Sequence, residues 1–231
     1  MIYVTGDTHG QLDRFQEKTC KRLTGRDTLI ICGDFGFIWD GGRQEEKMLS
    51  WIGSRKYRVL FIDGKHENFS LLNHNYPVEE YLGGRVHHIC GNLYHLMRGE
   101  VYTVEEKKIF TFGGGESADK EFRMEQNLWW EEELPTLREM QTGIQNLERE
   151  KLRVDYIVTH EPPARALRAL SGYRNDSANA LDVFFEEITR EVTYEKWFFG
   201  SAHQDKVILQ RHYALFHEVI PANGTPGKAR R

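Results

Sequence analysis

The chain has few cysteines, and their arrangement excludes two classes of small stabilised protein. Only three occur in 231 residues, Cys20, Cys32 and Cys90, and no two of them form a Cys-x-x-Cys pair. An odd number of widely spaced cysteines argues against a disulfide scaffold and against a structural zinc site. We therefore expect free thiols in a reducing cytoplasm, with Cys32 a small buried residue inside a strand.

Long apolar runs and a strong charge of one sign are also missing. No apolar run approaches the ~20 residues of a membrane span. The chain begins with a strand-like Ile2-Tyr3-Val4 segment and shows no export signal. The formal net charge of −4 does not indicate binding to nucleic acid or to anionic membranes, although it is compatible with a local basic groove. We expect a soluble, cytoplasmic protein without a membrane partner.

The apolar content that is present predicts a substantial core and an α/β fold. Hydrophobic residues make up 39% of the chain and aromatic residues 12%. Short runs rich in β-branched and aromatic residues predict buried strands at 2–4, 28–32, 58–62, 154–159 and 196–199. Helical patterns at about 11–23 and 43–54 separate the first three, which is the alternation of a sheet with helices packed outside it.

The middle of the chain has a different pattern. Residues 80–115 contain close-spaced strand-like segments and turn residues, which predicts an antiparallel meander. Two further helices and a terminal hairpin are predicted at about 135–151, 177–190 and 206–220. Because no linker divides the chain, we expect one domain over residues 1–220, followed by a flexible tail over residues 221–231.

Several predicted strands are followed by residues that can bind metal. These residues are Asp7, His9, Asp34, His66, His160 and His203. Singly they are weak signals, since Gly-Asp after a strand is more often a turn or a helix cap. Together they predict carboxylate and imidazole donors on one rim, which suits a pair of divalent cations about 3.5–4 Å apart. Such a pair stabilises charge on a phosphoryl group and lowers the pKa of a bridging water.

The order of these motifs resembles the calcineurin-like metallophosphoesterase family of bacterial and phage type. The family pattern is Asp-x-His, Gly-Asp, Gly-Asn-His-Asp/Glu, a lone His and Gly-His-x-His. This chain shows Asp7-Thr8-His9, Gly33-Asp34, Gly64-Lys65-His66-Glu67, His160 and Gly200-Ser201-Ala202-His203. The resemblance runs from Met1 to about residue 220. It implies a two-sheet β-sandwich flanked by helices (αββα) and hydrolysis of phosphomonoesters or phosphodiesters.

The resemblance also implies two metal sites, of which one is altered. The first metal would be held by Asp7, His9, Asp34 and His203, all of which are present. The second would use Asp34, His160 and the positions now occupied by Lys65 and Ser201. A charged lysine has no lone pair for a cation, and a serine hydroxyl is a poor substitute for imidazole. We expect one intact site for a divalent transition metal, with manganese first and iron, zinc or nickel as alternatives, and an impaired second site.

Roles for the remaining residues follow from the same resemblance. We expect the Lys65 ammonium to fill the vacated space, pair with Asp34 and bind substrate phosphate. His66 would be the general acid, the alternative being a buried structural histidine. For His160, a structural or phosphate-contacting role is the alternative to a ligand role.

Two functions are compatible with these residues. The first is a metal-dependent phosphoesterase impaired at its second metal site, acting on a phosphorylated small molecule or nucleotide. The alternative is an inactive protein of this fold that binds a phosphorylated ligand, a nucleotide or a protein partner. The absence of Asp-Arg-Gly after Gly33-Asp34 argues against the protein Ser/Thr phosphatase branch.

Overall fold

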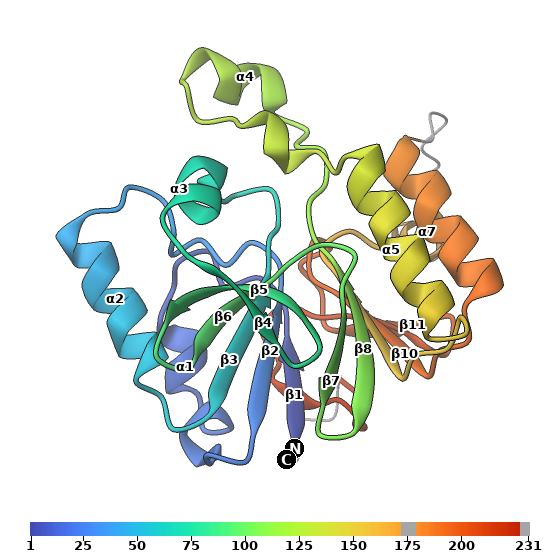
Figure 1. The fold of residues 1–231 in the computed structure, drawn as a ribbon, viewed down its shortest axis with the longest axis horizontal. Helices are drawn as coiled ribbons and strands as arrows, with labels where there is room; N and C mark the ends of the chain where they lie inside the picture. The colour runs from blue at the N-terminus through green and yellow to red at the C-terminus, as the bar shows by residue number, and fades with distance from the viewer. Residues whose placement is uncertain (172–178, 227–231) are drawn as a thin grey trace.

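The computed structural model of the protein describes residues 1–171 and 179–226, and in it two mixed β-sheets pack face to face between helices (Figure 1). The first sheet has the strand order β13-β1-β2-β3-β6-β5-β4. Its strands are β1 (Ile2–Thr5), β2 (Thr28–Cys32), β3 (Arg58–Ile62), β4 (Val78–Tyr81), β5 (Gly84–Cys90), β6 (Leu93–Leu96) and β13 (Ile220–Pro221). The second sheet has the order β11-β12-β10-β9-β8-β7. Its strands are β7 (Val101–Val104), β8 (Lys107–Phe112), β9 (Tyr156–Thr159), β10 (Lys196–Phe199), β11 (Lys206–Ile208) and β12 (His212–Ala214).

Helices cover the outer face of each sheet. The helices of the described residues are α1 (Asp13–Gln16), η1 (Cys20–Arg22), α2 (Arg43–Gly53), α3 (Phe69–His74), α4 (Lys120–Glu125), η2 (Glu131–Glu133), α5 (Leu137–Arg149), α6 (Ala164–Ser171) and α7 (Ala180–Glu191), of which α4 projects away from both sheets (Figure 1). Helices α1 and α2 lie against the first sheet, and α5 and α7 against the second (Figure 1). No helix of the described ranges combines the length and the apolar character that crossing a membrane demands.

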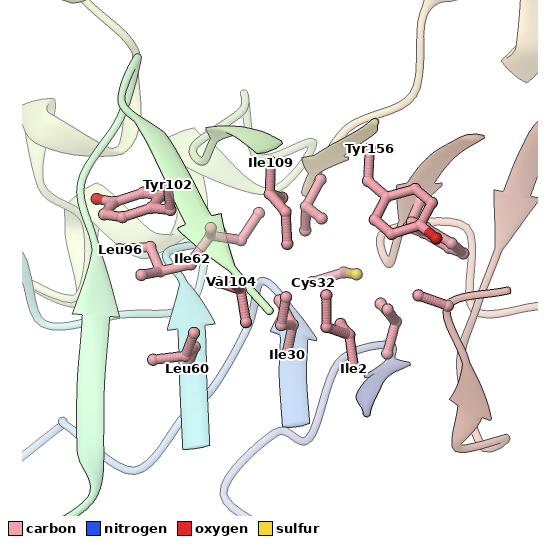
Figure 2. Packing of buried hydrophobic residues seen from close by; sticks show 14 of the residues in the cluster. Ile2, Ile30, Cys32, Leu60, Ile62, Leu96, Tyr102, Val104, Ile109 and Tyr156 are labelled. Atoms are coloured by element: carbon pink, nitrogen blue, oxygen red, sulfur yellow. The ribbon is translucent and has the colours of Figure 1, made fainter. Parts of the chain in front are cut away.

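The central strands β2, β3, β9 and β10 are buried on both faces, which explains their nearly continuous apolar sequences. In β2, Leu29 and Ile31 pack toward α2, whereas Ile30 and Cys32 pack into the layer between the sheets. This alternation is the two-residue period of a strand. The central layer joins side chains from both sheets (Figure 2). Cys32 is fully buried there, as predicted.

The structure corrects several element predictions. The expected meander is divided: β4, β5 and β6 join the first sheet, and β7 and β8 the second. Local patterning marks strands but not their partners, because both sheets offer equivalent apolar surfaces. The expected helix 11–23 is two short pieces, α1 and η1. The strand expected up to residue 220 ends at Ala214, and Ile220–Pro221 pairs with β1 instead.

The remaining differences concern the ends of predicted segments. Helix α7 starts at Ala180, after a capping box in which Asn179 and Asp182 exchange hydrogen bonds. The expected start of this helix at residues 177–178 lies outside the described residues, as do residues 227–231 of the expected tail. Ala222 is buried, so the packed part of the chain continues past residue 220.

Two buried histidines couple stability to pH. Side chains of His87 in β5 and His212 in β12 are 3% and 4% exposed. Burial lowers the pKa of His87 to about 3, and the neighbouring His95 acts in the same direction. Burial, reinforced by Arg211, lowers the pKa of His212 to about 4. Both values lie below the ordinary value of about 6.5, so at a pH between the folded pKa and about 6.5 each histidine takes up a proton when the chain unfolds.

We expect the free energy of unfolding to fall as the pH drops below about 6.5. The stabilisation from each neutral histidine is complete above that pH and is lost toward its folded pKa, at up to about 1.4 kcal/mol per pH unit. His87→Gln and His212→Gln should each lower stability at neutral pH but flatten this slope by roughly one proton. Urea unfolding across this pH range measures the slope, and an unchanged slope in both variants would contradict the assignment.

Candidate metal centre

The candidate site lies where parallel strands of both sheets end. In the first sheet, β1, β2 and β3 are parallel, and Asp7, Asp34 and the loop 63–67 follow them. In the second sheet, β9 and β10 are parallel, and His160 and His203 follow them. The two sheets therefore direct their donor residues to one end of the sandwich.

Close contact between loops fixes the backbone at this end. The amide of His9 donates to the carbonyl of Asp34 at 2.9 Å. Both residues have a positive φ, 47° and 40° respectively, which side-chain-bearing residues adopt at some energetic cost. A β-carbon at Gly33 would collide with the His160 ring, and one at Gly200 with the Asp7 carboxylate. The glycines of these motifs are therefore required for the loops to approach each other.

One group of donors consists of Asp7, His9 and His203. Nε2 of His203 lies 3.0 Å from Oδ2 of Asp7 and 3.1 Å from Nε2 of His9. Nε2 of His9 lies 3.8 Å from the same Asp7 oxygen. The Phe216 ring stacks on His203 with centroids 4.6 Å apart, which holds the imidazole in place. These three donors are spaced so that all of them could bind one ion.

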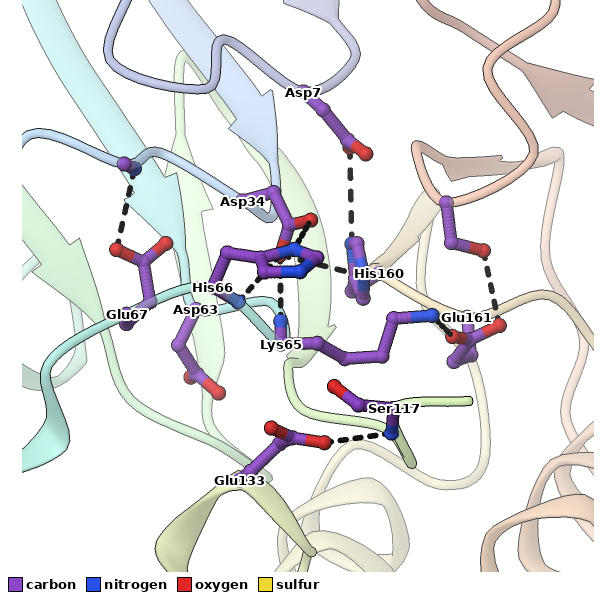
Figure 3. A network of polar contacts seen from close by, with 12 residues as sticks. Asp7, Asp34, Asp63, Lys65, His66, Glu67, Ser117, Glu133, His160 and Glu161 are labelled. Carbon is purple, nitrogen blue, oxygen red and sulfur yellow. Dashed lines mark hydrogen bonds and ion pairs between the residues drawn. The ribbon is translucent and has the colours of Figure 1, made fainter. Parts of the chain in front are cut away.

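A second, fully buried group consists of Asp7, Asp34 and His160 (Figure 3). Nδ1 of His160 lies 3.7 Å from Oδ1 of Asp7, and its Nε2 lies 3.6 Å from Oδ1 of Asp34. Among the described residues, neither Oδ1 of Asp7 nor Nε2 of His160 has a hydrogen-bond partner. Unpartnered buried polar atoms are costly. Their placement beside further donors fits a cation site.

The carboxylates of this site differ in their electrostatic environment. Burial raises the pKa of Asp7, and the nearby imidazoles of His160 and His203 only partly oppose it. Burial also acts on Asp34, but His160 and His66 outweigh it and hold the pKa of Asp34 below its usual range. Asp7 thus lacks a positive neighbour strong enough to offset its desolvation. A bound cation would supply that charge.

His66 is bound to Asp34, a partner that the sequence did not identify. Nδ1 of His66 lies 2.6 Å from Oδ2 of Asp34, and the backbone amides of Lys65 and His66 donate to Oδ1 at 2.6 and 2.9 Å. The hydrogen bond to Asp34 raises the pKa of His66. The His66 side chain is 42% exposed, so it is not the buried structural histidine of the alternative interpretation. Because Nδ1 faces a carboxylate, Nε2 is the nitrogen left for a ligand.

The expected ion pair between Lys65 and Asp34 is not formed. The Lys65 ammonium lies 2.6 Å from Oε1 of Glu161, and the Ser201 hydroxyl donates to Oε2 of the same carboxylate at 2.9 Å (Figure 3). Burial opposes ionisation of both Lys65 and Glu161, but their attraction raises the pKa of Lys65 and lowers that of Glu161. Both therefore stay charged. Glu161 thus binds both Lys65 and Ser201, the residues at the positions where the resemblance implies second-metal ligands.

Glu67 supports the loop that carries Asp34. Its carboxylate is fully buried and accepts hydrogen bonds from the amides of Phe35 and Gly36, at 2.6 and 3.2 Å. Burial raises the pKa of Glu67 well above its usual range, and Asp34 acts in the same direction. Neither Glu67 nor Glu161 was assigned a role from the sequence. For Glu161 the only signal was its position after the lone His160.

Comparison with curated proteins finds no match to this chain. The model of the family described as calcineurin-like phosphoesterase matches residues 1–212, which include every donor described above. This match and the two-sheet fold confirm the resemblance deduced from the motifs. The chain belongs to the calcineurin-like phosphoesterase family.

Proposed function

We propose that this protein is a metal-dependent phosphoesterase with one complete metal site and an impaired second one. The single observation that carries the metal assignment is the pair of unpartnered buried atoms, Oδ1 of Asp7 and Nε2 of His160, among converging donors. The first metal would be held by Asp7, His9, Asp34 and His203. His160 and Asp34 would be the surviving ligands of the second. When bound, a divalent metal polarises a phosphoryl oxygen and lowers the pKa of a bound water.

The chain's own residues supply the rest of the chemistry. The His66 ring, held by Asp34 through Nδ1, presents Nε2 to substrate. A proton on Nε2 can be donated to the leaving alcohol as its bond to phosphorus breaks. Asp34 stabilises the protonated imidazole before this transfer and keeps the ring oriented. This role for His66 is part of the proposal.

The impairment of the second site is supported by the Lys65–Glu161–Ser201 network. The Lys65 ammonium puts one positive charge near the second-metal position, but Glu161 neutralises most of it. A neutral pair attracts a phosphate less than a divalent ion does. The same network favours the second candidate function, an inactive protein that binds a phosphorylated ligand, nucleotide or protein partner. Turnover separates the two candidates.

We propose a phosphorylated small molecule or nucleotide as substrate, manganese as the first metal to test, and the cytoplasm as the compartment. The free thiols of Cys20, Cys32 and Cys90 support a reducing compartment. The negative net charge gives no support to nucleic acid as a general partner. Iron, zinc and nickel remain alternatives to manganese, because carboxylate and imidazole donors suit several transition metals.

The test combines metal analysis with hydrolysis. We expect protein purified with manganese to hold one tightly bound ion per chain and to hydrolyse p-nitrophenyl phosphate or its bis ester, with loss of activity after chelation. Metal binding without hydrolysis of either ester would favour the binding protein. Two tightly bound ions per chain would contradict the impaired second site.

A further inference from the structure

An arm between β8 and α5 projects from the end of the sandwich that carries the site. This arm, residues 116–133, contains α4 and η2 and lies at the end opposite the N-terminus, the end toward which β1 runs (Figure 1). Phe122 and Met124 on the arm are exposed, by 64% and 50%. Arg123 between them is only 5% exposed. An arginine buried among exposed neighbours is held by specific contacts.

The Arg123 guanidinium bonds to four acceptors. Three belong to the arm: Nη1 donates to the Ser117 hydroxyl at 2.6 Å and to the Glu133 carboxylate at 2.9 Å, and Nε donates to the Leu128 carbonyl at 3.1 Å. The fourth lies outside it, where Nη2 donates to the Lys65 carbonyl at 3.0 Å. The first three contacts, together with the hydrogen bond from the Ser117 amide to Oε1 of Glu133, close the arm on itself. The fourth links the arm to the loop that carries His66.

This fourth contact falls on a peptide group that the site also holds. The Lys65 carbonyl and the His66 amide belong to one planar unit. Arg123 binds its oxygen, and Oδ1 of Asp34 accepts from its N–H at 2.9 Å. A rigid plane held at both ends has a fixed orientation. The Cα of His66, which carries the side chain, is bonded directly to the nitrogen of this peptide group.

We propose that Arg123 is a positioning residue that holds the Lys65–His66 peptide and thereby keeps the His66 ring against Asp34. Lysine could not replace it, because an ammonium lacks the planar fork of donors that reaches four separate acceptors. The effect on turnover rests on the proposed function. The effect on the peptide does not, and it can be measured in the protein without hydrolysis.

The experiment replaces Arg123 and follows the His66 amide. In Arg123→Met we expect the amide of His66 to exchange its hydrogen about tenfold faster, measured by nuclear magnetic resonance. The kcat for p-nitrophenyl phosphate should fall about tenfold with KM nearly unchanged, because a misoriented acid impairs the transition state more than binding. Arg123→Lys should show most of the same change.

Control variants separate positioning from simple loosening of the arm. Phe122→Ala alters the exposed neighbour, and Ser117→Ala removes one arm acceptor of Arg123 but leaves its ion pair with Glu133 and its contact with Lys65. Neither should change His66 exchange or kcat. If Ser117→Ala changes both as much as Arg123→Met does, or if Arg123→Met and Arg123→Lys change neither, the proposal is overturned. If the unmodified protein hydrolyses no ester, the proposed function fails, and His66 exchange still decides the role of Arg123.

Discussion

Asp34→Ala should abolish tight metal binding and lower phosphoester hydrolysis by at least ~100-fold. Oδ1 of Asp34 accepts from the amides of Lys65 and His66, and Oδ2 binds the His66 ring. The same carboxylate lies 3.6 Å from His160 and 3.9 Å from His9. Under the proposed function its removal takes a shared ligand from both metal positions, and it also frees the loop that carries His66.

The effect of manganese on the melting temperature should show whether Asp34 binds the metal. A metal bound only to the folded state stabilises that state by mass action. Added manganese should therefore raise the melting temperature of the unmodified protein and leave that of Asp34→Ala nearly unchanged. Asp13→Ala, which removes an exposed carboxylate from α1, is the matched control and should retain the metal effect. Unchanged metal content in Asp34→Ala would exclude Asp34 from the site.

Asp34→Asn separates the contribution of the carboxylate charge from that of the backbone hydrogen bonds which the side chain accepts. The amide oxygen of asparagine can accept the two backbone hydrogen bonds, so the loop should keep its position. The missing negative charge weakens metal binding and removes the acceptor for the His66 imidazolium. We expect His66 amide exchange close to that of the unmodified protein together with a large loss of metal. If the protection of the His66 amide against exchange were lost together with the metal, the charge of Asp34 would also be needed to hold the loop.

The convergence of donors was predictable from the sequence because strand geometry determines it. Apolar runs that end in Asp7, Asp34 and His160 specify buried strands, and parallel strands deliver their carboxyl ends to one rim. Which donor side chains meet at this rim depends only on which strands run parallel. That arrangement survives errors elsewhere, such as the division of the expected meander between two sheets.

The partner of Lys65 could not be predicted in the same way. A lysine side chain is long and flexible, and several carboxylates lie within its reach near the rim. The partner that it binds, Glu161, is 96 positions away in the sequence. Arg123 presents the same difficulty, because it contacts the Lys65 carbonyl across 58 positions. Such choices depend on packing between loops, for which sequence patterns carry little information.

The second large effect concerns the residues that replace the second-metal ligands. Lys65→Asn combined with Ser201→His should restore two-metal occupancy and raise phosphodiester hydrolysis by about 100-fold or more. A second cation adds charge at the phosphoryl oxygens and further acidifies water, effects worth several kcal/mol. Each ~1.4 kcal/mol is a factor of ten in rate. Neither single change should do as much, because each leaves a missing ligand or an ammonium near the cavity.

Glu161 makes a sharper version of this test possible. Lys65→Asn alone leaves the Glu161 carboxylate with only the Ser201 hydroxyl, which should destabilise the protein by up to about 3 kcal/mol. Adding Glu161→Gln removes the uncompensated charge and should recover most of that loss. We therefore expect the triple variant, with asparagine, glutamine and histidine at 65, 161 and 201, to be more stable without metal than the double variant.

Elemental analysis and hydrolysis of bis(p-nitrophenyl) phosphate decide the outcome. Metal content and kcat should be lowest in the unmodified protein and higher in either single variant. Both quantities should be highest in the double and triple variants. Stability without metal should depend on whether the Glu161 charge is compensated, so it should not follow this order. The effect on stability can therefore be separated from the effect on metal binding and turnover. Suppose instead that the unmodified protein binds two ions and turns over as fast as the double variant. The Lys65 ammonium would then leave the second-metal position free while bound to Glu161, and the argument for impairment would fail.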